Sequence, residues 1–287
     1  MSATHIVLVG GPDSGKTNYI GRLWAALLAR KGKLLAPQLP EDIRYVEETV
    51  EHLRKGDFAP RNSKSFEDSR RDFVVSIVRA EDTSSKVIDI VVPDVTGELW
   101  KSAVETFEIT AEWMEQLQHS DGALLFVRVH SDQNIEPLDW VNSERLLKTI
   151  APDTKDNSAV PTQVMLCELL RFLEITLKRG DDGAIPRVAV IVTAWDLLDR
   201  EAQAAGPSEY LRTQYPLFAG KLLNADKIEV KTFGVSILGG DLIEPRFRNR
   251  FLKSGSLETM GYCVFENDSS LHKDDDMTYP VAWLLNR

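Results

Sequence analysis

Residues 10–17 read Gly-Gly-Pro-Asp-Ser-Gly-Lys-Thr and directly follow the apolar run 5–9. This is the phosphate-loop pattern GxxxxGK[ST], in the place between a buried strand and a helix that the pattern requires. Glycines allow the backbone to curl so that successive N–H groups point at an anion. The following helix presents the positive end of its dipole to the same anion. The stretch therefore predicts a nucleoside triphosphate site on an α/β fold.

The residues of this loop have separate expected roles. Lys16 is long enough to reach the β- and γ-phosphates, and the hydroxyl of Thr17 is a ligand for Mg²⁺. Asp13 either ligates a cation such as K⁺ or caps the following helix, and both roles stay open. The residues expected to surround the phosphates, besides Lys16 and Thr17, are Gly11, Pro12, Asp13, Ser14, Gly15 and Asn18.

Composition excludes several functional classes. The 287 residues are 43% hydrophobic and 27% charged, as in an ordinary soluble protein. The net charge of −10 argues against a nucleic-acid partner, which needs a basic face. No apolar run approaches the ~20 residues of a membrane span. Two cysteines are too few for a disulfide framework. We expect a cytoplasmic protein whose oligomeric state the sequence does not define.

The order of the apolar segments predicts a P-loop α/β fold. Strand-like and helix-like stretches alternate, which favours a mostly parallel sheet with helices on both faces. We expect one domain over residues 1–287. Its six expected strands are 5–9, 72–79, 86–92, 123–129, 187–192 and 229–235. The short polar connection between the second and third strands predicts an antiparallel hairpin at one edge.

Helices and insertions complete the expected domain. The expected helices are 16–30, 100–118, 162–178, 207–223 and 280–285. Three stretches, at about 34–69, 131–161 and 241–278, fit neither pattern and are expected to be helical or loop insertions. Insertions of this length are more often functional lids or partner surfaces than passive connections.

A second nucleotide-associated pattern, DxxG, closes the third expected strand. The carboxylate of Asp94 can hold Mg²⁺, and the N–H of Gly97 can contact a γ-phosphate. Glu98 stands where many GTPases place a water-orienting glutamine. Because a γ-phosphate repels a carboxylate, we expect slow hydrolysis. The alternative role of Glu98 is that of an exposed switch residue. Ser63 is the expected further Mg²⁺ ligand, with a plain polar loop as its alternative.

The fifth expected strand ends in a base-selective pattern that is close to [NT]KxD. Thr193 is its first residue, and Asp196 would accept hydrogen bonds from guanine N1 and N2, which adenine cannot donate. The usual lysine, which covers the base and braces the phosphate loop, is replaced by Ala194. Trp195 either covers the base instead or belongs to the core.

The sixth expected strand ends in Ser236 and Ile237, a loose match to the S-A-[KL] loop whose backbone N–H meets guanine O6. Its value lies in the order of the motifs. The phosphate loop, DxxG, TxxD and the serine loop each follow the expected strand in the expected sequence, and four coincidences are less plausible than one GTPase.

These residues resemble P-loop GTPases of the Ras-like and translation-factor type. More narrowly, G-G-P-D-S-G-K-T-N-Y, P-D-V-T-G-E, V-T-A-W-D, F-G-V-S and D-D-D-M-T-Y-P-V-A-W-L-L resemble a bacterial double-GTPase family of the TRAFAC class. The resemblance implies a Ras-like G domain that takes GTP, GDP and Mg²⁺. It also implies a second GTPase and a large associated protein as partners, in an intracellular conflict or phage-defence system.

Three functions remain open at this stage. The first is a regulatory GTPase that hydrolyses GTP slowly, which Lys16, Thr17 and Asp94 favour. The second is a module that holds nucleotide with little turnover and recruits partners, which Glu98 and the lack of a threonine ahead of the second strand favour. The third is an ATP-using P-loop enzyme, suggested by Ala194.

Overall fold

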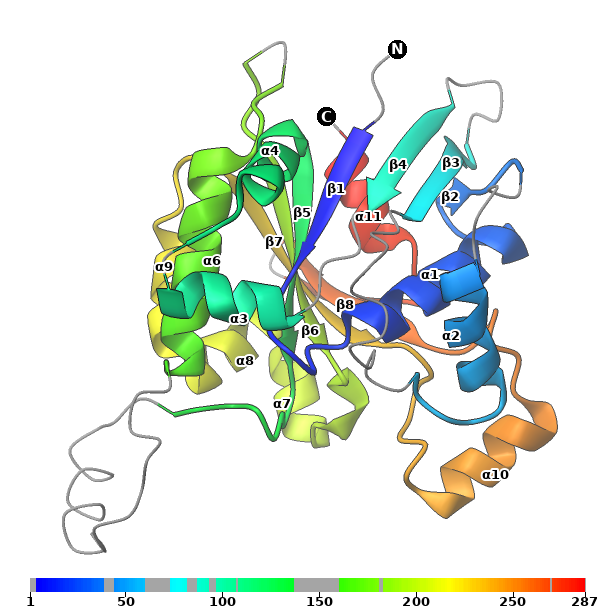
Figure 1. Cartoon of the computed structure of the whole chain (residues 1–287). Helices are drawn as coiled ribbons and strands as arrows, with labels where there is room; N and C mark the ends of the chain where they lie inside the picture. Colours follow the sequence, from blue (N-terminus) through cyan, green and yellow to red (C-terminus); the bar gives the residue numbers. More distant parts are fainter. Residues whose placement is uncertain are drawn as a thin grey trace, which may run out of the picture.

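The computed structural model describes residues 4–38, 44–59, 73–81, 87–92, 97–106, 108–136, 160–180, 183–268 and 270–286. Within these residues, nine strands form one sheet in the order β2-β3-β4-β1-β5-β6-β7-β8-β9 (Figure 1). The strands are β1 (Thr4–Val9), β2 (Leu34–Leu35), β3 (Phe73–Arg79), β4 (Ile88–Val92), β5 (Gly122–Arg128), β6 (Arg187–Thr193), β7 (Glu229–Ser236), β8 (Tyr262–Asn267) and β9 (Ser270–Asp274).

The centre of the sheet is parallel, as the sequence predicts. Strands β4, β1, β5, β6 and β7 run in one direction. Their near-continuous Val, Ile and Leu content suits strands that are covered on both faces. Strand β3 pairs antiparallel with β4, with Phe73 opposite Val92, which confirms the expected hairpin. The expected fold class, a mostly parallel α/β sheet behind a phosphate loop, is therefore confirmed.

The sheet is wider than the six strands expected. Strand β2 adds to β3 at one edge, while β8 and β9 extend from β7 at the other, all antiparallel. Strand β2 lies in the stretch 34–69, and β8 and β9 lie in 241–278, so these stretches are not only loops and helices. The apolar run 262–265 forms most of β8, whereas β9 is polar and largely exposed, as suits an edge strand.

Two of the expected helices are divided. Stretch 100–118 forms two helices because Thr110 caps the second one, accepting a hydrogen bond from Trp113 N at 3.4 Å. Stretch 207–223 breaks at Pro216, which has no N–H to continue a helix. The described helices are α1 (Lys16–Ala29), α2 (Arg44–Arg54), α3 (Gly97–Thr106), α4 (Ala111–His119), α6 (Thr162–Thr176), α7 (Arg200–Ala205), α8 (Pro207–Gln214), α9 (Pro216–Leu223), α10 (Pro245–Ser254) and α11 (Tyr279–Leu285), with a 3-10 turn η2 (Trp195–Leu197). In the described part of the chain, no helix has the length and apolar character needed to cross a membrane.

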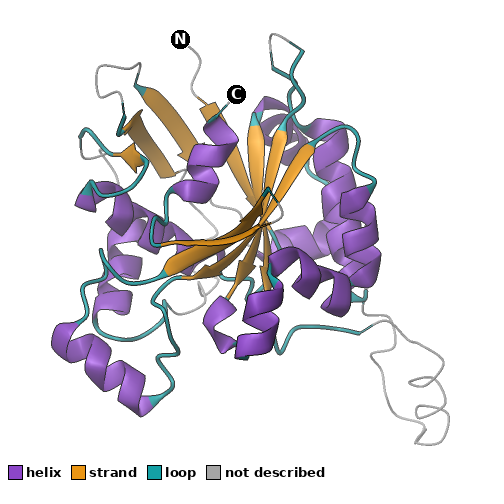
Figure 2. Ribbon diagram, turned by 180° about the vertical axis from the view of Figure 1, so that it is seen from behind, coloured by secondary structure: helices purple, strands orange, loops and turns teal. Residues whose placement is uncertain are grey.

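Helices cover both faces of the sheet (Figures 1 and 2). Along β1, Ile6 and Leu8 belong to one core cluster, with residues of α1, α2, α10 and α11. Val7 and Val9 belong to a second cluster, with residues of α3, α4, α6, α8 and α9. This alternation is the period of two that a strand imposes on its side chains. Because the helices after β1 and β5 cover opposite faces, the carboxyl ends of these two strands border the crevice where open α/β sheets bind ligands.

The acidic run at 274–276 ties the β2 edge to the start of α11. Asp276 Oδ2 accepts a hydrogen bond from Lys33 N at 2.7 Å, and Oδ1 accepts from Thr278 N at 2.8 Å and Thr278 Oγ1 at 2.6 Å. Thr278 Oγ1 in turn accepts from Leu34 N at 3.2 Å. A Cβ on Gly32 would overlap the Asp276 carboxylate, so only glycine fits beside this clamp.

Candidate nucleotide-binding site

The phosphate loop leaves β1 and enters α1 through three residues with unusual backbone angles. Gly10 has φ of +153°, Asp13 of +60° and Gly15 of +91°. A Cβ on Gly15 would lie 3.1 Å from Thr193 Oγ1, and one on Gly10 would lie 2.9 Å from Ser14 Oγ. Glycine is needed at both positions because the backbone is left-handed or tightly packed there. The loop therefore has the tight curl that a phosphate cradle requires.

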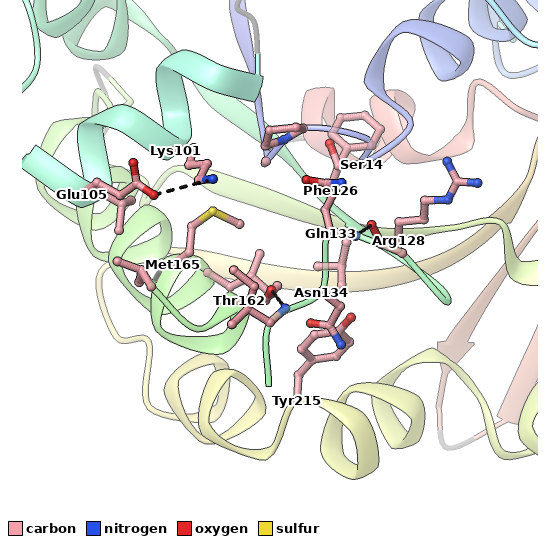
Figure 3. A pocket seen from close by; sticks show the side chains of 18 residues that line it. Ser14, Lys101, Glu105, Phe126, Arg128, Gln133, Asn134, Thr162, Met165 and Tyr215 are labelled. Carbon is pink, nitrogen blue, oxygen red and sulfur yellow. Dashed lines mark hydrogen bonds and ion pairs between the residues drawn. The ribbon is translucent and has the colours of Figure 1, made fainter. Parts of the chain in front are cut away.

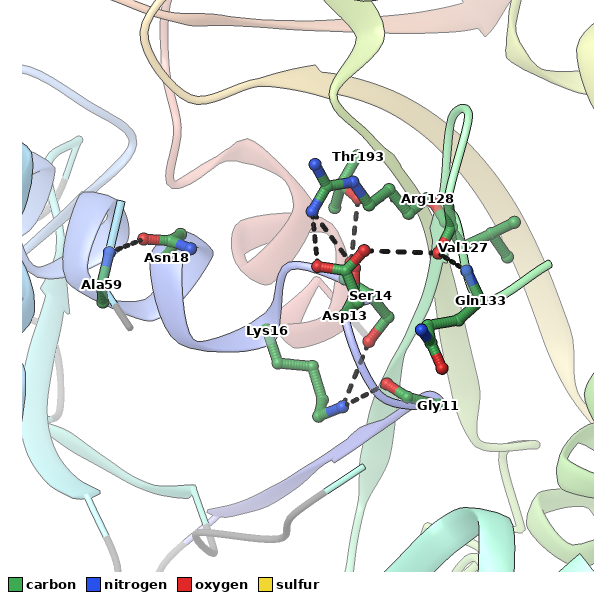
Figure 4. A network of polar contacts seen from close by, with 11 residues as sticks. Gly11, Asp13, Ser14, Lys16, Asn18, Ala59, Val127, Arg128, Gln133 and Thr193 are labelled. Carbon is green, nitrogen blue, oxygen red and sulfur yellow. Dashed lines mark hydrogen bonds and ion pairs between the residues drawn. The ribbon is translucent and has the colours of Figure 1, made fainter. Parts of the chain in front are cut away.

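Lys16 closes over this loop. Its Nζ donates a hydrogen bond to the carbonyl oxygen of Gly10 at 2.7 Å. It also donates to the carbonyl oxygen of Gly11 at 3.0 Å and to Ser14 Oγ at 3.1 Å (Figure 4). The ammonium group is thus held at the loop by neutral oxygens. Phosphate oxygens are stronger acceptors for an ammonium group, so a bound phosphate can replace these contacts.

Thr193 connects the base-selective pattern to the phosphate loop. Its Oγ1 donates to Ser14 O at 2.9 Å, and both residues are buried. Thr193 is the last residue of β6, so the sheet fixes its position. The structure therefore brings together two motifs that the sequence analysis recognised separately.

Asp13 is paired with Arg128, a residue that the sequence analysis did not select. Arg128 Nη1 lies 2.7 Å from Asp13 Oδ1, and Ser131 Oγ donates to Asp13 Oδ2 at 3.4 Å (Figure 4). The N-cap of α1 is Gly15 and has no side-chain cap, so the capping role considered for Asp13 is wrong. The overlooked signal was a charged residue ending the buried strand β5, at the edge where parallel strands bind ligands.

Asp196 and Ser236, expected to read the base, lie next to each other. Burial raises the pKa of Asp196, while a hydrogen bond with Ser236 lowers it. Ser236 is fully buried at the end of β7, and its Oγ accepts from Gly239 N at 2.9 Å. Ile237 follows, and a Cβ on Gly261 would overlap its carbonyl oxygen. The backbone of the serine loop is thus tightly packed behind a partly buried carboxylate.

Trp195 belongs to the core, which decides between its two alternative roles. Its side chain is fully buried and meets Tyr210 edge-on, with ring centroids 5.9 Å apart. It also occupies the space that a Cβ on Gly234 would take. Ala194 has a left-handed φ of +57° and brings no cation to the site. Neither residue can perform the bracing that a lysine at position 194 would give.

A pocket lies next to the phosphate loop, between α3, β5 and α6 (Figure 3). Gly11 and Pro12 form part of its wall, Met165 of α6 reaches toward Gly11, and Lys101 faces Glu105 at 3.7 Å. Its lining includes Ser14 and Arg128 but not Thr193, Asp196 or Ser236, so it adjoins the phosphate loop without including the residues expected to read the base.

The remaining expected residues fall into three groups. Thr17 and Asn18 lie in the first turn of α1, where Asn18 Oδ1 accepts a hydrogen bond from Ala59 N at 3.0 Å. Gly97 and Glu98 are the first residues of α3. Asp94 and Ser63 lie outside the described residues, as do parts of the stretches 34–69 and 131–161.

The phosphate loop follows β1, and Thr193, the first residue of the guanine-type motif, bonds to it from the end of β6. This arrangement defines a P-loop GTPase domain of Ras-like type. The chain belongs to the Double-GTPase 1 family (DO-GTPase1), whose sequence profile matches residues 7–284. The double-GTPase family expected from the motifs is thereby confirmed. Membership implies GTP and GDP as ligands.

The solved structures similar to this chain include the following two. One is the bacterial selenocysteine-specific elongation factor EF-Sec, with 13% identity and a TM-score of 0.33 over 82% of this chain and 26% of that chain. This chain therefore spans about a quarter of that factor. The other is the signal recognition particle receptor SRb-GTP/SRX complex from Chaetomium thermophilum, with 12% identity and a TM-score of 0.38 over 84% of this chain and 94% of that chain. No curated protein matches the sequence.

Proposed function

We propose that this protein binds GTP, hydrolyses it slowly and acts as a conformational switch. The observation that carries the proposal is the hydrogen bond from Thr193 Oγ1 to Ser14 O, because it joins a base-selective motif to the phosphate loop. The half-buried carboxylate of Asp196 supports guanine over adenine, since adenine has no pair of donors to satisfy it. Ser236 and Ile237 complete the base site in this proposal.

In the proposed mechanism, Lys16 exchanges its carbonyl contacts for the β- and γ-phosphate oxygens and offsets their charge. Gly11 to Gly15 cradle the phosphates, and the backbone of Gly97 contacts the γ-phosphate. Glu98 is the water-orienting candidate, and the repulsion between its carboxylate and the γ-phosphate is the reason for slow turnover.

We assign Mg²⁺ to Thr17, Asp94 and Ser63. Mg²⁺ usually takes only a few protein oxygens and completes its shell with phosphates and water, so a hydroxyl at the start of α1 fits this donor set. When bound there, the ion would neutralise phosphate charge. The position of Thr17, directly after Lys16, supports this assignment.

The test is a titration of the purified protein with fluorescent GTP and ATP in Mg²⁺, followed by phosphate release from the nucleotide that binds. We expect GTP selectivity with slow release. Preference for ATP would overturn the guanine assignment. Tight GTP binding without phosphate release would favour the alternative, a recruitment module that holds nucleotide with little turnover. Glu98 is the residue that suggests this alternative.

We extend the proposal to partners: a second GTPase and a large associated protein, acting in cellular conflict or phage defence. The double-GTPase family is the support for this extension. Co-purification of a second GTPase with the tagged chain from its native cells tests the first part, and phage plating on a deletion strain tests the second.

A further inference from the structure

We propose that Arg128 supplies the cation that guanine-binding domains usually take from the lysine of the [NT]KxD motif, which here is Ala194. The inference rests on the proposed binding of guanine nucleotide and names a positioning residue for that site. It explains how the site keeps a positive charge although the motif has lost its own.

The sheet places Arg128 beside the altered position. Strands β5 and β6 are parallel, with Arg128 opposite Thr193, and Val129 N donates to Thr193 O at 3.1 Å. Ala194 is the next residue along the chain. The cation therefore comes from the adjacent strand, close to the backbone position that would otherwise carry the lysine.

Arg128 also makes the contacts that brace the phosphate loop. Its Nη1 donates to Asp13 Oδ1 at 2.7 Å and lies 3.4 Å from Asp13 O (Figure 4). Asp13 is in a left-handed conformation, and a charge-assisted hydrogen bond holds it there. Both side chains are mostly shielded, at 33% and 25% exposure, so solvent screens this ion pair less than a surface pair. Among the described residues, the buried Arg128 Nε has no hydrogen-bond partner, so Nη1 alone makes the contacts to Asp13.

The same charge acts on the base site. Burial raises the pKa of Asp196, and the nearby carboxylate of Asp241 adds to this, whereas the positive charge of Arg128 lowers it. Guanine recognition needs the ionised carboxylate, because only that form accepts from both N1 and N2. Arg128 thus contacts the phosphate loop directly and acts on the base carboxylate only through its charge.

The experiment compares four proteins for fluorescent GDP affinity, selectivity for GTP over ATP, and thermal stability: wild type, Arg128→Ala, Arg128→Ala with Ala194→Lys, and Arg212→Ala. The last is a matched control, because Arg212 is an exposed arginine that, among the described residues, forms its ion pair with Glu209 on its own helix. We expect Arg128→Ala to weaken GDP binding by about tenfold, as the loss of a charged hydrogen-bonding partner predicts. We expect the added lysine to restore most of this affinity, and Arg212→Ala to change nothing.

Each other outcome is decisive. Unchanged affinity in Arg128→Ala overturns the inference alone. In a second outcome, Arg128→Ala melts with wild-type cooperativity and loses affinity that Ala194→Lys does not restore. That result assigns Arg128 a structural role and also overturns the inference. If Arg128→Ala does not fold, Arg128→Gln replaces it, with the same expected loss of affinity and the same expected rescue by Ala194→Lys; unchanged affinity in Arg128→Gln overturns the inference. Wild-type protein that binds no guanine nucleotide overturns the proposed function itself.

Discussion

The hydroxyl of Thr193 donates to the backbone carbonyl of Ser14 at 2.9 Å, across 179 positions of sequence. Thr193 ends β6, and Ser14 lies in the loop after β1. A Cβ on Gly15 would press against the same hydroxyl at 3.1 Å. The two motifs are therefore in direct contact, so we expect a substitution in one to affect the other.

Replacing Thr193 with Val removes this hydroxyl and keeps the side-chain volume. The carbonyl of Ser14 then loses a buried partner, which costs about 1–3 kcal/mol of stability in the nucleotide-free protein. We also expect weaker binding of GTP and GDP alike, measured by fluorescence titration, with stability from urea unfolding. Thr193→Ser keeps the donor and is the control; equal losses in both variants would contradict the role of the hydroxyl.

Replacing Asp196 with Asn changes which base the site prefers. An amide cannot accept from both guanine N1 and N2, but its N–H can donate to the 2-oxygen of xanthine. We expect the affinity for GTP to fall by more than about tenfold and that for XTP to rise. Competition of both nucleotides against fluorescent GDP measures this, and an unchanged ratio of GTP to XTP affinity would place the base elsewhere.

The raised pKa of Asp196 predicts an opposite pH dependence for stability and for binding. Burial is the main cause of the rise, so the folded nucleotide-free protein holds this proton more tightly than the unfolded chain. The free energy of unfolding therefore falls as the pH rises from the ordinary pKa of an aspartate through the raised pKa of Asp196. Asp196→Asn should lack this pH-dependent loss of stability. GTP affinity should instead fall as the pH drops through the raised pKa. Urea melts of both proteins from acid to neutral pH, with parallel titrations, test both slopes.

Gly261 supports the serine loop. It has φ of +87°, and a Cβ there would overlap the carbonyl oxygens of Ile237 and Ser236. Gly261→Ala should therefore destabilise the protein by more than the ~1 kcal/mol of backbone strain and weaken GTP binding. Gly183→Ala is the matched control, since Gly183 has φ of +83° with nothing within 4 Å of its Cβ position. Similar effects in both variants would show that only backbone strain matters.

The clamp at Asp276 predicts unequal effects along the acidic run. Asp276→Ala leaves the N–H groups of Lys33 and Thr278 without their carboxylate and should cost about 1–3 kcal/mol in urea unfolding. Asp275 is exposed, so Asp275→Ala removes the same charge at nearly no cost. Equal effects would mean that net charge, and not the clamp, governs stability here.

The larger part of the fold was predictable because its signals are local. The phosphate loop, the buried parallel strands and the β3–β4 hairpin follow from glycine placement, apolar runs and a short polar connection. The edge strands β2 and β9 were not predicted because β2 has only two residues and β9 is polar. Neither has a sequence pattern that identifies a strand without knowledge of the strand it pairs with. The helix boundaries at Pro216 and Thr110 also follow from local chemistry, because proline has no N–H to continue a helix and a threonine side chain can cap one.

The sequence by itself determined the phosphate-loop pattern, the TxxD pattern and the double-GTPase family, since the spacing of residues after each strand sets these features. Only the tertiary structure decided that Trp195 is core, that Asp276 is a clamp and that Arg128 meets Asp13. Each of these depends on side chains from separate elements, and register and packing bring those side chains together. No periodicity in the chain encodes which residue of one strand faces which loop of another.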